Sequence, residues 1–575
     1  MTTAALRRAS FPTSGSWSGN IGAEAAASST SSASTAVTDA FTAPQHLPAW
    51  THLAAHRERL GTRHVADLFA ADAGRFGTLS REAAGLLVDF SRQRLDAETL
   101  DDLLALAAEA RLGDGIAALF GGQAVNHTEG RAALHMALRR GCRVPAADAD
   151  ELARTATRMR EFARQLRNGE LRGASGEAIR RVVNLGIGGS DLGPRMAAEA
   201  LAGPAASTPV EVRFVANIDP RELDEALAGA RAEETLFIVS SKSFTTAETL
   251  ANAHAARTWL RATLGEATPL DAHFLAVSNA TGAAAAFGIP ADRVLPMPEW
   301  VGGRYSVWSA IGLPLLIALG EDGFDALLAG AREMDEHFRN APLTANLPVL
   351  MGLVGLWNAD FIGASTLAVL PYAHGLRNFP AWLQQLEMES NGKRALRDGT
   401  FTAVATSPVV WGGAGTVGQH AFHQLFYQGT HCVPVDFIVT AGKGDARRQA
   451  LADNALAQAA ALTHGRSLDE ARAALRARGL PPAEIERLAP HLEIPGNQPS
   501  TTVLLADLDP ASLGRLMALY EHKVFVQGWI WGINSFDQYG VELGKEMARR
   551  LADDPDGARD GATLGMQRAL ARRGG

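Results

Sequence analysis

The chain has 575 residues, 47% hydrophobic and 20% charged, a composition typical of a soluble globular protein with more than one domain. Its formal net charge is −8, so no nucleic-acid-binding surface is expected. Two cysteines exclude a disulfide framework and are typical of a reducing compartment, and no apolar run reaches the ~18 residues of a membrane span. We therefore expect a cytoplasmic protein with neither a membrane nor a nucleic-acid partner.

Residues 1–45 consist mainly of Ala, Ser and Thr and carry only four charged side chains. Such a segment buries too little apolar surface to offset its ordering entropy, so it is predicted to be a disordered extension. A dispensable extension, or a start codon placed too early, explains it better than a targeting segment, because arginine is scarce and no amphipathic repeat occurs.

Residues 46–150 are predicted to form a helical N-terminal segment. Apolar residues recur at roughly helical spacing from Leu87 to about residue 112. A second helix is expected over Arg131–Arg139, with Thr128 as its N-cap.

Beyond residue 180, short β-branched runs alternate with helical stretches, which is the pattern of βαβ units and a parallel sheet. Strands are expected at 182–185, 210–215, 235–239, 273–277, 366–370, 409–411, 435–439 and 501–505, and helices at 192–201, 219–230 and 246–263. The fold class is therefore α/β, with one domain over 151–320 and another, including C-terminal helices, over 321–550. The two are joined near residues 315–330, and residues 551–575 form a tail.

A glycine-rich loop follows the first of these strands and opens a helix. Gly186, Gly188 and Gly189 allow the backbone to come close to a ligand, and the helix start offers free N–H groups. The dinucleotide fingerprint requires a glycine where Asp191 stands, which disfavours an NAD-dependent enzyme. The loop indicates either a site for an anionic ligand or a tight turn without function.

A second loop, at 240–249, combines six hydroxyl side chains with Lys242 at another helix start. Hydroxyls, backbone N–H groups and the helix dipole suit a phosphate dianion, whereas a simple capping box with Glu248 in the first turn is the alternative. Because ligands of open α/β sheets bind at the carboxyl ends of strands, the two loops together predict a phosphate site.

Candidate acids and bases follow in the second half of the chain. Glu387 and Glu389 end an amphipathic helix, and His420 and His423 follow a glycine-rich loop. Taken alone, each is more often a surface or structural residue. The histidine pair lacks the i, i+4 spacing and a nearby carboxylate, so no metal is expected.

Two cations complete the candidates. Lys545 follows a loop entering a helix, where a solvated surface lysine is the ordinary interpretation. Arg304 follows Gly302 and Gly303, a sequence that fits a close backbone passage, and a structural ion pair is an equal alternative.

Taken together, these segments resemble the glucose-6-phosphate isomerase (phosphoglucose isomerase) family, in order along the chain. The matching stretches are Val125–Arg139, Gly186–Pro194, Ser241–Thr249, Val301–Pro314, Gln385–Lys393, Gly418–Leu425 and Gln527–Lys545. The resemblance implies two sugar-isomerase (SIS-type) α/β domains, a homodimer, and cofactor-free interconversion of glucose 6-phosphate and fructose 6-phosphate in glycolysis and gluconeogenesis.

The resemblance also implies a role for each matched residue. The phosphate loop corresponds to Ser241, Lys242, Ser243, Thr245 and Thr246, with Gly189 and Ser190 beside it. Glu389 matches the base that moves a proton between C1 and C2, Gln385 a substrate contact, and Arg304 the cation near the developing enediolate. His420, contributed across the dimer interface, matches the ring-opening residue. Lys545 matches the residue that assists His420 at the ring oxygen, and Glu248 matches the carboxylate partner of His420.

The chemistry of aldose–ketose isomerisation agrees with these residue types, since it needs one base, a cation at the enediolate and a separate acid–base group for ring opening. Two departures from the family occur, at Thr416–Gly418 and at Leu386–Glu387. Two other functions stay open: a non-catalytic sugar-phosphate sensor and an isomerase of another hexose 6-phosphate, such as mannose 6-phosphate or an amino sugar.

Overall fold

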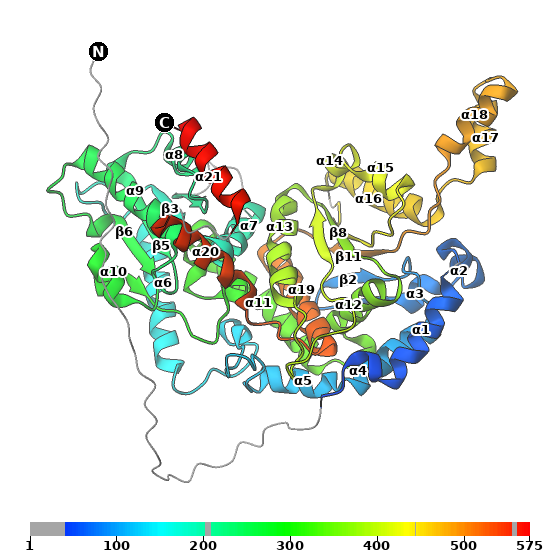
Figure 1. Cartoon of the computed structure of the whole chain (residues 1–575). Coiled ribbons are helices and arrows are strands. Elements are labelled where there is room, and N and C mark those ends of the chain that lie inside the picture. Colours follow the sequence, from blue (N-terminus) through cyan, green and yellow to red (C-terminus); the bar gives the residue numbers. More distant parts are fainter. Residues whose placement is uncertain (1–40, 62, 202–208, 443, 555–559, 575) are drawn as a thin grey trace, which may run out of the picture. The chain divides into compact units, whose positions relative to one another are not determined.

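The computed structural model describes residues 41–61, 63–201, 209–442, 444–554 and 560–574. Most of the predicted disordered extension lies outside the described residues. Its predicted end at residue 45 falls inside a 3₁₀ turn, Pro44–His46. The described chain forms two sheets flanked by helices, which confirms the predicted α/β class (Figure 1).

The first sheet is parallel throughout, in the order β4-β3-β5-β6-β7. Its strands are β3 (Arg181–Leu185), β4 (Glu211–Val215), β5 (Thr235–Ser240), β6 (Phe274–Val277) and β7 (Val294–Leu295). Four of them lie within one residue of the predicted bounds, while β7 was not predicted. Leu185 pairs in register with Val239, so the loops that follow β3 and β5 open at the same edge of the sheet.

The second sheet has the order β1-β2-β11-β10-β8-β9. Its strands are β1 (Ser80–Ala83), β2 (Leu86–Asp89), β8 (Thr366–Tyr372), β9 (Val409–Gly412), β10 (Val435–Thr440) and β11 (Ser500–Leu505). The strands β11, β10, β8 and β9 are parallel and agree with the predicted ones, whereas β1 and β2 add an antiparallel edge.

Helices cover both sheets. The N-terminal ones are α1 (Pro48–Leu60), α2 (Val65–Ala71), α3 (Arg75–Leu79), α4 (Ala97–Glu109) and α5 (Leu112–Phe120). Helix α6 (Ala149–Arg167) precedes the first sheet in sequence. The strands of this sheet then alternate with α7 (Leu192–Leu201), α8 (Pro220–Leu227), α9 (Ala247–Leu264) and α10 (Thr281–Phe287). The second half holds α11 (Leu313–Asn340), α12 (Leu347–Leu356), α13 (Phe379–Gln384), α14 (Gly415–Gln419), α15 (His423–Gln428), α16 (Ala446–His464), α17 (Leu468–Ala477), α18 (Pro482–Leu492), α19 (Pro510–Trp531), α20 (Glu542–Asp553) and α21 (Gly561–Gly574). Within the described residues, no helix is long and apolar enough to cross a membrane.

The long helices α11 and α19 lie between the two sheets (Figure 1). A Cβ atom at Gly330 would lie 1.9 Å from the Ala511 carbonyl, and one at Gly514 would lie 2.1 Å from the Leu327 carbonyl. The two helices therefore pack backbone against backbone at glycines. Helix α11 also runs through the predicted junction at 315–330, so the two halves of the chain share one core instead of meeting at a linker.

The helical structure predicted from the spacing between Leu87 and about residue 112 is wrong in its first part, where Leu86–Asp89 forms strand β2. Ala84 and Gly85 both have positive φ angles (47° and 70°) and form a two-residue turn between β1 and β2. Such a turn matches the twist of a hairpin, and β2 pairs with β11, so sheet pairing outweighs the helical spacing of the leucines.

The predicted helix over Arg131–Arg139 is also wrong. Only His135–Arg139 turns, as a 3₁₀ helix, and Thr128 does not cap it but donates a hydrogen bond to Asp537 (2.6 Å). The buried side chains of this segment bind distant elements, and these tertiary contacts override the local helical preference.

Candidate active site

The glycine loop after β3 lies against the segment that carries Arg304. A Cβ at Gly189 would lie 2.0 Å from the carbonyl oxygen of Gly303, so only glycine permits this approach. Ser190 ends a 3₁₀ turn at 188–190, and Asp191 accepts a hydrogen bond from Arg195 (2.9 Å). Asp191 thus holds the start of α7, and burial raises the pKa of its carboxyl to about 6.

The hydroxyl loop after β5 gathers its side chains at the start of α9. Ser241 and Thr246 hydroxyls are 3.0 Å apart, and those of Ser243 and Thr245 are 2.6 Å apart. Ser243 and Thr245 are exposed. Thr246 is the N-cap residue of α9 but makes no side-chain capping bond, so the hydroxyls and the free N–H groups are available to an anion.

Lys242 lies in the same loop and faces Glu299. Its Nζ is 3.0 Å from the Glu299 carboxylate, which also accepts a hydrogen bond from Asn279 (2.7 Å). Desolvation would raise the pKa of Glu299, but the bonds from Lys242 and Asn279 lower it below its usual range. Lys242, which the resemblance assigns to phosphate binding, is therefore paired with the Glu299 carboxylate in this structure.

Glu389 ends a π-helical turn, Gln385–Glu389, that continues α13. Gln385 donates a hydrogen bond to its carboxylate (3.0 Å), and Arg304 lies 3.5 Å away. The Glu389 side chain is 23% exposed and that of Arg304 is 1% exposed. The carboxylate is thus reachable from outside while the guanidinium lies beneath it.

Uncharged acceptors hold Arg304 in place. It donates to the Ser390 hydroxyl (2.6 Å), to the carbonyls of Ser535 (2.6 Å) and Asp537 (3.1 Å), and to the side-chain oxygen of Gln538 (3.1 Å). These groups orient the guanidinium without neutralising its charge. The charge can therefore act on an anion formed next to Glu389.

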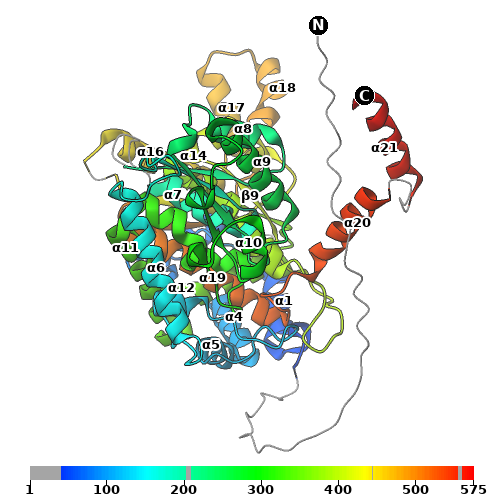
Figure 2. The same ribbon diagram turned by 90° about the vertical axis from the view of Figure 1, so that its left-hand side faces the viewer.

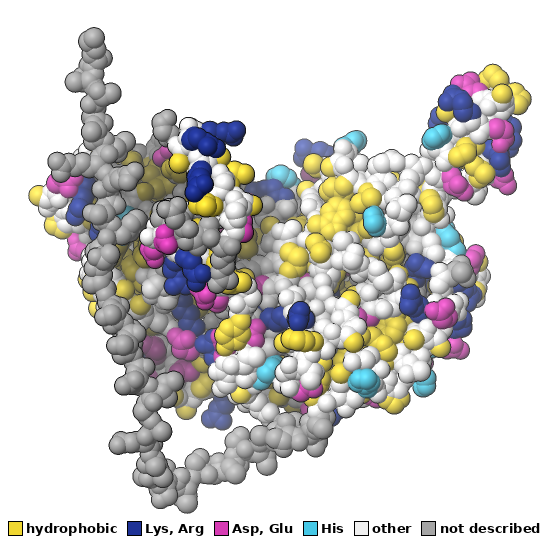
Figure 3. Space-filling view, viewed as in Figure 1, with side chains coloured by type: hydrophobic (Ala, Val, Ile, Leu, Met, Phe, Trp, Pro, Cys, Tyr) yellow, Lys and Arg dark blue, Asp and Glu magenta, His cyan; other side chains and the backbone are white. Residues whose placement is uncertain are grey.

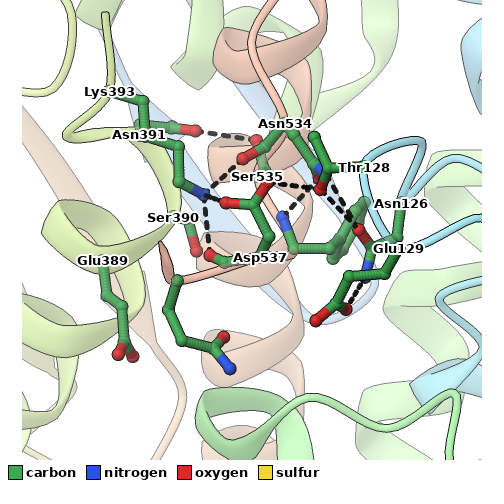
Figure 4. Close-up of polar contacts among 12 residues, drawn as sticks. Asn126, Thr128, Glu129, Glu389, Ser390, Asn391, Lys393, Asn534, Ser535 and Asp537 are labelled. Atoms are coloured by element: carbon green, nitrogen blue, oxygen red, sulfur yellow. Dashed lines mark hydrogen bonds and ion pairs between the residues drawn. The ribbon is translucent and has the colours of Figure 1, made fainter. Parts of the chain in front are cut away.

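Sequence reasoning did not single out Gln538, Lys393 or Asp537, although all three lie in the matched stretches. Lys393 binds the Asp537 carboxylate (3.0 Å) and the carbonyls of Asn534 and Asp537, and Figure 4 shows Glu389 to one side of this polar network. Burial, followed by the Arg304 charge, lowers the pKa of Lys393 to about 8.

Two predicted residues, His420 and Lys545, form no hydrogen bond or ion pair with Arg304 or Glu389 in the described part of the chain. His420 is exposed at the end of α14, and Lys545 is 60% exposed on α20, where it pairs with Glu542 (2.8 Å). Glu248 is half-buried in the first turn of α9. In the described part of the chain, no hydrogen bond or ion pair joins His420 to Glu248, or Lys545 to Glu389. Across the residues that the structure describes, no three His, Cys, Asp or Glu side chains form a cluster able to hold a metal ion.

The fold and this site define an α/β protein with a hydroxyl-rich loop at the start of a helix and a carboxylate set against an arginine. A sequence profile described as phosphoglucose isomerase matches residues 89–565, and the chain belongs to this family.

Several known proteins are similar to most of the chain. A protein of Aromatoleum aromaticum named glucose-6-phosphate isomerase is 65% identical, covering 93% of this chain and 98% of its own length. A protein of Deinococcus deserti with the same name is 50% identical, and the match covers 92% of this chain and 98% of that protein. The crystal structure of a glucose-6-phosphate isomerase from Chlamydia trachomatis is 31% identical, with a TM-score of 0.78, and covers 92% of this chain and all of that one.

Proposed function

We propose that the chain is a glucose-6-phosphate isomerase, which reversibly interconverts glucose 6-phosphate and fructose 6-phosphate in glycolysis and gluconeogenesis. Its family membership and the names of its relatives support this activity. The observation that carries the chemistry is the Glu389 carboxylate, held by Gln385 and lying 3.5 Å from Arg304.

Proton transfer is assigned to Glu389. The carboxylate takes the proton from C2 of the open-chain aldose and returns it at C1 through a cis-enediol, and the reverse reaction runs the same path. Arg304 stabilises the negative charge on O1 and O2, because its charge is held by neutral acceptors. Gln385 keeps the carboxylate oriented and contacts the substrate.

Phosphate binding is assigned to the hydroxyl loop. Ser241, Ser243, Thr245 and Thr246 supply donors at the start of α9, whose dipole favours an anion. Gly189 and Ser190 lie in the neighbouring loop of the same sheet edge. Lys242 joins the phosphate when its bond to Glu299 is exchanged for one to the ligand.

Ring opening is assigned to His420, with Lys545 near the ring oxygen, Glu248 as the carboxylate partner of His420, and the histidine contributed by a second copy of the chain. The exposure of His420 and Lys545 supports a homodimer, since among the described residues of one chain no hydrogen bond or ion pair joins either of them to Glu389.

The C-terminal helices support the dimer as well. Helix α20 has no buried residue, and Leu543, Met566 and Leu570 are between 56% and 64% exposed. Figure 2 shows α20 and α21 running clear of both sheets, and Figure 3 shows apolar side chains beside basic ones on them. A second copy would cover these apolar side chains. We place the reaction in the cytoplasm because both cysteines are free thiols.

The direct test is glucose 6-phosphate formation from fructose 6-phosphate, without added cofactor and with or without EDTA. We expect equal rates in both conditions, with mannose 6-phosphate formed far more slowly. No glucose 6-phosphate from the folded dimer would overturn the proposed activity.

A further inference from the structure

Three consecutive polar residues of α19 are buried: Glu521, His522 and Lys523 are each 2% exposed or less. Successive residues of an α-helix point about 100° apart, so these side chains extend in three directions. Charged side chains are almost never fully buried without a partner. Each of the three has one, and each partner lies on a different element.

Glu521 reaches the segment that carries Arg304. Its carboxylate accepts hydrogen bonds from Trp308 Nε1 (2.8 Å) and from Arg139 (2.6 Å). Arg139 also lies over the Trp308 ring, 4.5 Å from its centroid. Trp308 ends the 3₁₀ helix Gly303–Trp308, four residues after Arg304, so α19 fixes the far end of the turn that presents the guanidinium.

His522 ties the same cluster to α11. It lies 2.7 Å from the Asp335 carboxylate, which also binds Arg139 through two hydrogen bonds (2.6 and 2.7 Å). The side chains of Arg139, Asp335 and Glu521 have no measurable exposure. The cluster therefore leaves α19 little freedom to shift against α11.

Lys523 reaches the segment that carries Glu389. Its Nζ donates to Glu387 (2.9 Å), which also accepts a bond from Asn391 (3.1 Å). Asn391 in turn donates to the Val524 carbonyl of α19 (3.0 Å). Glu387 lies within the π-helical turn two residues before Glu389, so one carboxylate faces α19 while the other faces Arg304.

We propose that Glu521 and Lys523 are positioning residues that set the distance between Arg304 and Glu389. The inference rests on the proposed isomerase function, in which these two groups act on the same enediolate. Buried ion pairs contribute little net stability compared with apolar residues of similar volume, so stability alone does not explain the cluster. A need for exact geometry does explain the cluster, because a displacement of about 1 Å at a reacting centre can lower the rate about 10²-fold.

The test loosens each contact without leaving Glu521, Lys523 or Glu387 as an unpaired buried charge. The buried Asp436 carboxyl, on which the Lys523 charge acts, keeps its hydrogen bond from Tyr520 (3.0 Å). Trp308→Phe keeps a ring beneath Arg139 but removes the N–H bonded to Glu521. Lys523→Met combined with Glu387→Leu replaces the ion pair by apolar side chains. Both variants are expected to lower kcat about tenfold or more with KM within about threefold, because the groups that bind the ground state are untouched. Trp308→Phe should melt close to the wild-type Tm.

Leu513→Ala is the matched control, a fully buried apolar residue on the same helix. It should lower the Tm, since removing a buried leucine side chain costs about 2–5 kcal/mol, yet leave kcat unchanged. Wild-type kcat in both loosened variants, or kcat losses that follow Tm across all three, would overturn the positioning role. A wild-type protein without isomerase activity would overturn the proposed function itself, whereas an active one with normal variants overturns only this inference.

Discussion

The two halves of the predicted catalytic set lie in contrasting surroundings. Arg304 and Glu389 are 3.5 Å apart, and the hydrogen bonds that Arg304 donates to Ser390 and Ser535 hold the arginine. His420, which directly follows α14, and Lys545 on α20 are exposed. Both halves come from sequence matches of the same kind. The folding of one chain brings together the two residues to which we assign proton transfer, but not the two to which we assign ring opening.

The energetics of the two regions agree with this contrast. An exposed i, i+3 pair such as Lys545 with Glu542 contributes little to stability because solvent screens it, so little holds that lysine in place. Each hydrogen bond to Arg304, a charged donor, is worth roughly 1.5–3 kcal/mol. The surroundings of Lys545 can therefore rearrange if the proposed dimer forms, whereas Arg304 is already held in place within one chain.

The largest effect is expected for Glu389→Gln. The amide keeps the size and the contact with Gln385 but cannot accept a proton, so kcat should fall by at least about 10²-fold with KM within a few-fold. Steady-state kinetics checks this, with substitution of the exposed Glu161 of α6, Glu161→Gln, as the control. A variant that keeps half the wild-type rate would remove Glu389 from its assigned role.

His420→Ala should separate the two halves. If His420 opens the ring, activity on cyclic substrate should fall by up to about 10²-fold, while open-chain substrate is converted at nearly the wild-type rate, because Glu389 serves both forms. Rapid-mixing measurements with freshly released open-chain sugar phosphate distinguish them. Equal losses on both forms would contradict a ring-opening role.

The phosphate loop should show a smaller effect. Ser243→Ala with Thr246→Ala removes one hydroxyl from each pair, so KM and the Kd of a sugar-acid 6-phosphate should rise together by about tenfold. Thr258→Ala, later on the same helix, is the matched control. An unchanged Kd would place the phosphate elsewhere.

The smallest effect concerns a buried carboxylate outside both halves. Burial raises the pKa of Asp360 to about 7, so the folded state binds its proton more tightly than the unfolded state. Its contribution to stability is complete below about pH 4 and is lost as the pH rises through 7. Asp360→Asn keeps an acceptor for Trp531 and should raise the Tm at pH 8 by about 2 °C without changing kcat. Thermal melts at pH 5 and pH 8 test this, and an equal shift at both would contradict the titration.

Much of the fold could be predicted, because the parallel strands are buried β-branched runs and their helices are bounded by clear start and stop residues. The N-terminal segment could not. The Ala84–Gly85 turn competes with helical leucine spacing, and the outcome depends on β11, which lies about 400 residues further on.

The site was predictable where its chemistry is local, as in the hydroxyl loop. Glu521 and Lys523 look like ordinary surface charges on a helix, and only packing against Trp308 and Glu387 makes them part of the site. For His420, only the sequence resemblance suggests a partner, because the site we propose for it includes a second chain.

Mixed dimers test the central claim most directly, namely that one chain supplies Glu389 while its partner supplies His420. Co-refolding Glu389→Gln with His420→Ala, both strongly impaired on cyclic substrate, should restore activity on that substrate, because one of the two sites in each mixed dimer then receives both intact groups. Recovered activity that rises with the heterodimer fraction measured by native mass spectrometry is the predicted result. No recovery in the presence of heterodimers would show that both residues act from one chain and would contradict the account.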